Sequence, residues 1–111
     1  MNIRQGDIYW LQPAPEEGIA HPYVVIQVPD NDVDTVTVCA LTSNIKRVSL
    51  PGNVLLEAGE SNLSRPSVVE VSKTASVAPD RLGDYIGTLT PQRVEQILAG
   101  IRFVQTAYFR D

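Results

Sequence analysis

Residues 22–29 read Pro22-Tyr23-Val24-Val25-Ile26-Gln27-Val28-Pro29, a nearly continuous apolar run enclosed by two prolines. A run of this kind predicts a strand over Tyr23–Val28 that is buried on both faces of a sheet. The polar loop Asp30-Asn31-Asp32 follows it. Thr35–Leu41 then alternates β-branched residues and predicts the next strand.

Further short β-type runs lie on both sides of this pair. They are Asp7–Gln12, Asn53–Glu57, Ser67–Lys73 and Tyr85–Thr88. Prolines and glycines separate them, and several short strands with turn residues between them are typical of a small β-barrel or sandwich.

The periodicity changes after Thr90, which can cap a helix that has Pro91 at its first position. Apolar residues then recur at the spacing of one helical face: Val94, Ile97, Leu98, Ile101 and Val104. The pattern predicts one amphipathic helix of about 16–18 residues lying on the sheet. Gly100 inside it costs up to roughly 1 kcal/mol relative to alanine, so we expect it to allow a close approach to another backbone.

A chain of 111 residues with 43% hydrophobic residues predicts one folded domain over residues 1–111. Its net charge of −4 counts against a simple basic nucleic-acid binder. The charge is uneven, because residues 1–40 hold one cation and six acidic residues, whereas residues 41–111 hold eight cations and seven acidic residues. A locally basic surface can therefore form at Lys46, Arg47, Arg65 and Lys73.

The chain has one cysteine, Cys39, and one histidine, His21. These counts exclude an internal disulfide framework, a cysteine-based zinc cluster and a two-histidine zinc site, and they fit a reducing cytosol. Cys39 stands inside an apolar strand, which favours a core residue over a nucleophile. The start of the chain lacks the apolar core of a signal peptide, and no apolar stretch approaches the roughly 18–20 residues of a membrane span, so we expect a soluble, cytoplasmic protein.

Three polar clusters are candidates for chemistry. His21 stands between a loop and a strand, where an imidazole can exchange protons near neutral pH or simply be exposed. Leu41–Arg47 places two hydroxyls, an amide and two cations after a strand, and such a set can hold a phosphate or form an ordinary polar turn. Ser67–Ser76 mixes hydroxyl groups with valines, a pattern equally suited to an edge strand.

Six segments, taken in order, carry a family resemblance: Arg4–Trp10, Pro22–Ile26, Leu41–Arg47, Pro51–Val54, Ser67–Val69 and Ile86–Leu89. Together they cover nearly the whole chain and resemble the MazF/PemK family of toxin endoribonucleases from bacterial toxin–antitoxin systems. The resemblance implies a mainly β fold with a C-terminal α-helix, a small SH3-like β-barrel of the CcdB/PemK plasmid-toxin type, working as a homodimer.

The resemblance also implies an activity and partners. The activity is metal-independent and cofactor-independent cleavage of single-stranded RNA, in which a ribose 2′-OH attacks the adjacent phosphate and leaves 2′,3′-cyclic phosphate and 5′-OH ends. The inhibitor is a cognate antitoxin protein that lays an acidic or apolar tail over the RNA groove. No membrane partner is implied.

Residue by residue, Thr42 falls on the family's active-site threonine, and His21 stands where the family has an arginine. We predict His21 as a general acid or base and Thr42 as a hydrogen-bond donor to a phosphate oxygen. The predicted RNA- or phosphate-binding residues are Ser43, Asn44, Lys46, Arg47 and Lys73, and Lys46 or Lys73 would balance the developing charge.

Two other functions fit the same sequence. One is a non-catalytic toxin of a very similar barrel that binds and inhibits a protein such as DNA gyrase, and the other is a catalytically decayed barrel that binds a partner. The histidine at the family's arginine position and the acidic total favour these alternatives, whereas Thr42-Ser43 and Lys46-Arg47 favour RNA.

Overall fold

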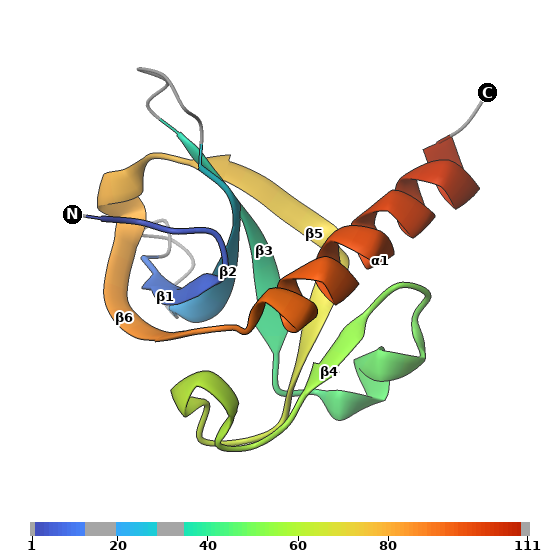
Figure 1. Cartoon of the computed structure of the whole chain (residues 1–111), viewed down its shortest axis with the longest axis horizontal. Helices are drawn as coiled ribbons and strands as arrows, with labels where there is room; N and C mark the ends of the chain where they lie inside the picture. Colours follow the sequence, from blue (N-terminus) through green and yellow to red (C-terminus); the bar gives the residue numbers. More distant parts are fainter. Residues whose placement is uncertain (1, 13–19, 29–34, 110–111) are drawn as a thin grey trace.

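The structure, a computed structural model, describes residues 2–12, 20–28 and 35–109. It contains six strands, three short 3-10 helices and one α-helix in the described ranges (Figure 1). The strands are β1 Asp7–Leu11, β2 His21–Gln27, β3 Val36–Thr42, β4 Val54–Leu56, β5 Ser67–Val77 and β6 Leu82–Thr88. The helices are η1 Ile45–Ser49, η2 Glu60–Asn62, η3 Pro79–Arg81 and α1 Pro91–Phe109.

All six predicted strands and the predicted helix are confirmed, with differences at their ends. β5 runs on to Val77 instead of ending at Lys73, because its second half pairs with the first half of β3, where Val36 lies opposite Val77. β4 is confined to the three residues that pair with β5. The loop predicted at residues 30–32 lies outside the described residues.

The strands form one antiparallel sheet in the order β4-β5-β3-β2-β1-β6. The sheet curls, and α1 crosses it over β5 and β4 (Figure 1). The mainly β fold with a C-terminal helix is confirmed, but the sheet is not closed, since β4 and β6 are its two edges. We call the gap between these two edges the seam.

Side chains of η2 reach across the seam. The Ser61 hydroxyl donates to the Thr88 carbonyl at 2.8 Å, and the Asn62 amide donates to the Ile86 carbonyl at 3.0 Å. Both acceptors are backbone groups of the edge strand β6, which would otherwise have no strand to bind them. The curled sheet is thus completed by a loop where a closed barrel would have a ladder of hydrogen bonds.

Apolar side chains fill both faces of the curled sheet. One cluster lies between the sheet and α1 and includes Val24, Cys39, Leu41 and Ile97. A second cluster includes Tyr9, Val25, Val38 and Leu82. Val24 and Val25 are both buried but belong to different clusters, which confirms that β2 is buried on its two faces.

A buried carboxylate joins β1 to β6. Asp7 is 1% exposed, and its Oδ1 accepts a hydrogen bond from the Thr88 hydroxyl at 2.7 Å. Its Oδ2 accepts from the Arg4 backbone N–H at 2.9 Å. Because a buried charge is costly without such donors, this arrangement fixes the end of β6 against β1.

Cys39 is fully buried and its thiol donates to the Glu70 carbonyl at 3.0 Å. Burial, and then the charge of Glu70, raises the pKa of the Cys39 thiol to about 12. A thiol that stays protonated is a poor nucleophile, so the interpretation of Cys39 as a core residue holds.

The helix begins as predicted, with the Arg93 N–H donating to the Thr90 hydroxyl at 3.3 Å. Its buried face carries Ile97 and Val104, and Gly100 lies against the backbone of Gly52. A Cβ at Gly100 would overlap the Gly52 carbonyl oxygen, which confirms the expected close approach of the two backbones.

We predict that Gly100→Ala destabilises the protein by about 1–3 kcal/mol, because overpacking at Gly52 outweighs the gain in helix propensity. Urea unfolding of the variant and the parent protein measures this difference. A more stable variant would contradict the packing of α1 on Gly52.

Candidate functional site

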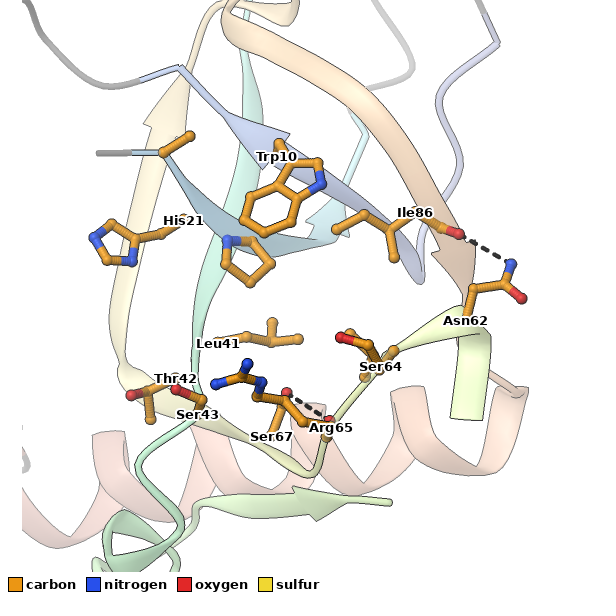
Figure 2. Close-up of a pocket in the computed structure, with 13 residues that line it drawn as sticks. Trp10, His21, Leu41, Thr42, Ser43, Asn62, Ser64, Arg65, Ser67 and Ile86 are labelled. Carbon is orange, nitrogen blue, oxygen red and sulfur yellow. Dashed lines mark hydrogen bonds between the residues drawn. The ribbon is translucent and has the colours of Figure 1, made fainter. Parts of the chain in front are cut away.

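An open groove of about 470 Å³ lies where β1, β2 and β3 face the loop between β4 and β5 (Figure 2). Thr42, Ser43 and the guanidinium of Arg65 lie together at one end, which is polar, and His21 lies at the rim (Figure 2). Trp10 and Ile86 lie at the other end, with Asn62 at its edge (Figure 2), and the groove lining also includes Pro22 and Leu63. The groove therefore offers polar groups next to an apolar surface.

At the polar end, Thr42 is the last residue of β3 and Ser43 is the first residue after it, and both line the groove. The Thr42 hydroxyl oxygen accepts a hydrogen bond from the Asn44 N–H at 3.2 Å. That bond fixes the oxygen without using the O–H, which can donate to a ligand.

Arg65 reaches the same end from the other side. Figure 2 shows its guanidinium extending from the β4–β5 loop toward the side of the groove where Thr42 and Ser43 lie. Among the described residues, no carboxylate lies within ion-pair distance of Arg65. A guanidinium in this position presents several N–H donors and a positive charge to an anion in the groove.

His21 is the first residue of β2 and lies opposite Leu11 of β1. Its side chain is exposed, and Figure 2 shows the imidazole at the rim of the groove, turned away from Trp10. An imidazole at this rim can reach a ligand that extends beyond the groove.

The remaining predicted residues lie apart from the groove lining. The buried carboxylate of Glu70 forms ion pairs with Arg47 and Lys73, each at 3.6 Å. The Asn44 side chain accepts from the Lys46 N–H at 3.2 Å and caps η1. The groove lining thus includes His21, Thr42 and Ser43 but not the other four, and the predicted roles of all seven residues stay predictions.

Sequence reasoning gave no site role to Trp10, Ser64 or Arg65. Trp10 is 42% exposed on a strand whose other residues are buried. Arg65 was expected only on a basic surface, because nothing in the local sequence links it to Thr42. The loop conformation that joins them depends on contacts with β6.

Glu60 anchors the β4–β5 loop to α1. Its carboxylate accepts hydrogen bonds from Arg93 Nε at 2.6 Å and Nη2 at 3.2 Å. Burial raises the pKa of Glu60, but the Arg93 hydrogen bonds, the Glu57 N–H and the Arg93 charge together bring that pKa below its ordinary value. The hydrogen bond to Glu60 raises the pKa of Arg93.

Among the described residues, no group of three or more His, Cys, Asp or Glu side chains lies close enough together to hold a metal ion. In the same part of the chain, no helix is both long enough and apolar enough to span a membrane.

Residues 4–104 match the family model described as the PemK-like, MazF-like toxin of type II toxin–antitoxin systems. The chain belongs to this family. The match covers most of the chain, so the resemblance inferred from the six sequence segments is confirmed.

Curated relatives support the same assignment. The chain is 31% identical to Endoribonuclease MazF6 of Mycobacterium tuberculosis, with 94% of this chain and 97% of that protein covered. It is 28% identical to Endoribonuclease EndoA of Bacillus subtilis, with 87% and 89% covered. The relatives are named endoribonucleases, and nothing in these comparisons supports the alternative of a gyrase-binding toxin.

Solved structures share the fold of this MazF-like chain. An endoribonuclease from a mycobacterial species in complex with its cognate antitoxin has a TM-score of 0.74 at 21% identity, with 99% of this chain and 100% of that chain covered. The Mycobacterium tuberculosis toxin MazF-mt6 has a TM-score of 0.72 at 22% identity, with 95% and 98% covered. The predicted fold class is therefore confirmed, with an open sheet.

We predict a pH-dependent contribution of Glu60 to stability. Because its pKa is lowered in the folded protein, the contribution is complete above its ordinary pKa of 4.5 and is lost as the pH falls through the folded value. Glu60→Gln should destabilise the protein by about 1 kcal/mol at pH 7, with a smaller difference in acid.

The measurement is urea unfolding of both proteins from pH 7 down to the acid limit of folding. Glu95→Gln, which removes an exposed carboxylate from α1, the helix that carries Arg93, is the control and should leave stability nearly unchanged. A Glu60→Gln effect that is independent of pH would contradict the pairing with Arg93.

Proposed function

We propose that this MazF-like toxin is an endoribonuclease that cleaves single-stranded RNA at the polar end of the groove without a metal ion. The observation that carries the proposal is the placement of the Thr42 hydroxyl and the Arg65 guanidinium at one end of a groove whose other end is apolar. Each nucleotide of RNA offers both a phosphate and a base, so both ends of the groove have a partner. The endoribonuclease names of the curated relatives support the same activity.

The proposed reaction needs no metal ion. The ribose 2′-oxygen forms a bond to the adjacent phosphorus, and the bond from phosphorus to the 5′-oxygen breaks. Two protons move: one leaves the 2′-hydroxyl and one is gained by the departing 5′-oxygen, and His21 carries out one of these transfers while solvent water carries out the other. The products are a 2′,3′-cyclic phosphate and a 5′-OH end.

The polar residues of the groove stabilise the charge that develops on the phosphate. Thr42 donates its O–H to a phosphate oxygen, with Ser43 beside it, and Arg65 supplies positive charge from the opposite side. Arg65 thereby takes over the electrostatic part of the role that the family's arginine has where this chain has His21.

The apolar end of the groove suits a nucleobase. Trp10 exposes 42% of its surface there, and Pro22 lies opposite it on β2. A base stacked on an aromatic side chain gains about 1–3 kcal/mol without strong dependence on sequence. Since few cations line the groove, RNA affinity should depend only weakly on salt.

The proposal includes a homodimer. Three exposed apolar residues follow one another along and just after η1, namely Ile45, Val48 and Leu50. Leu50 also lines a second hollow of about 430 Å³, together with Val71, Ile101 and Val104. An apolar surface of this kind is suited to burial against a second copy.

A cognate antitoxin protein is the proposed inhibitor, since the solved endoribonuclease of similar fold is in complex with its cognate antitoxin. We propose that the antitoxin covers the RNA groove of this chain. RNA as substrate and a cytoplasmic location, where RNA is accessible, belong to the same proposal.

The test is incubation of the purified protein with a mixed-sequence RNA in EDTA, followed by mapping of the ends. We expect 5′-OH ends, and at least about tenfold slower cleavage for Arg65→Ala, Thr42→Ala and His21→Ala, since each removes a charge, donor or proton-transfer group. Arg102→Ala removes an exposed cation of α1 outside the groove and is the control.

Each outcome has a distinct meaning. If expression of the protein arrests cell growth but the purified protein does not cleave RNA, a toxin that binds a protein target replaces the proposal. If the protein neither arrests growth nor cleaves RNA, it is a decayed barrel that binds a partner. Full activity of His21→Ala would remove only His21 from the mechanism, whereas full activity of Arg65→Ala would overturn the assignment of the groove.

For the homodimer, light scattering at micromolar concentration should give twice the mass of the chain, and Leu50→Asp should shift the protein toward the monomer. Leu55→Asp is the matched control, because Leu55 is 40% exposed and Leu50 is 42% exposed, but Leu55 lies outside the proposed interface. A monomeric parent protein would contradict the dimer.

A further inference from the structure

The loop that carries Arg65 is held by side-chain hydrogen bonds to β6. Ser61 donates to the Thr88 carbonyl at 2.8 Å and Asn62 donates to the Ile86 carbonyl at 3.0 Å. The two acceptors are alternate residues of one strand, so they face the same side of β6. The loop is therefore held at two successive points along the strand edge.

The backbone of the loop fits this one position. Ser61 and Asn62 have positive φ angles of 51° and 65°, and both lie in the left-handed region. Gly87 lies between the two acceptors, and a Cβ there would overlap the Ser61 carbonyl. The close approach thus depends on an asparagine that tolerates the left-handed region and on a glycine that leaves room.

The held segment leads directly to the groove. Leu63 is 7% exposed and packs in the core, and Ser64 and Arg65 then line the groove. Beyond Arg65, the Ser67 hydroxyl donates to the Arg65 carbonyl at 3.3 Å. The backbone of Arg65 is consequently fixed on both sides, although its side chain has no ion pair among the described residues.

We propose that Ser61 and Asn62 are positioning residues, whose hydrogen bonds to β6 hold the Arg65 guanidinium toward Thr42 in the groove. This inference rests on the proposed function, because only that function gives Arg65 a role, namely to stabilise charge on the phosphate. Neither residue needs to touch the reacting phosphate. Their effect on cleavage passes through Arg65.

Asn62→Gly separates the two roles of Asn62. Glycine adopts the left-handed conformation readily but removes the amide that donates to Ile86. Gln5→Ala is the matched control, because the Gln5 amide also donates to a strand carbonyl, that of Ile26 at 2.9 Å, and Gln5 does not line the groove.

The decisive experiment is a double-mutant cycle on RNA cleavage with Asn62→Gly, Arg65→Ala and the double variant. We expect Asn62→Gly to lower kcat about tenfold, because a misplaced catalytic group loses rate steeply. The double variant should be no slower than Arg65→Ala alone, while Gln5→Ala keeps the parent kcat. An equal loss in both backgrounds, or no loss from Asn62→Gly, would overturn the inference.

Hydrogen exchange of the protein without RNA tests the same inference when cleavage cannot. Asn62→Gly should speed amide exchange in residues 63–65 and leave β2 and β3 unchanged. Unchanged exchange at residues 63–65 would overturn the positioning role even if the parent protein cleaves RNA. A parent protein without cleavage overturns the proposed function, and the exchange result then decides the positioning by itself.

Discussion

The seam between β4 and β6 is the constraint on which the rest of the structure depends. A curled sheet that stops short of closure leaves the carbonyls of its last strand without partners, and such edges invite pairing with other chains. Here η2 supplies the donors from Ser61 and Asn62. The same loop, tied to α1 through Glu60 and Arg93, then forms one wall of the groove. The same β4–β5 loop therefore both covers the edge of β6 and forms part of the groove.

The charge near the groove matters more for RNA binding than the net charge of the protein. The net charge of −4 argues against a nucleic-acid ligand, and the sequence predicts a basic surface that would offset it. Two cations of that surface, Arg47 and Lys73, are paired with the buried Glu70. The pair with Arg47 joins η1 to β5, and the pair with Lys73 lies within β5, so the contribution of Arg47 is to the shape of the segment after Thr42. Of the arginines and lysines in the described part of the chain, Arg65 lines the groove, and one well-placed guanidinium is worth more to a phosphate than several that are paired elsewhere.

Local sequence predicted most of the elements, since strands with alternating or continuous apolar residues and a capped amphipathic helix are specified by neighbouring residues. It also predicted the contact at Gly100. The family resemblance, not a local pattern, assigned site roles to His21, Thr42 and Ser43; the structure places them along one groove, and these roles stay predictions. Arg65 and Glu70 were not found as site or anchor residues, because their roles depend on partners far along the chain. Asn62 binds Ile86, and Glu70 binds Arg47, although the two residues of each pair lie far apart in the sequence, so no local pattern predicts either contact.

The most direct measurement is a crystal structure of the protein with a short RNA that carries 2′-O-methyl groups and cannot be cleaved. The account predicts a phosphate within hydrogen-bond distance of the Thr42 hydroxyl and the Arg65 guanidinium, with a base against Trp10. A phosphate bound instead at Arg47 and Lys73, with the groove between Thr42 and Arg65 free of RNA, would contradict it.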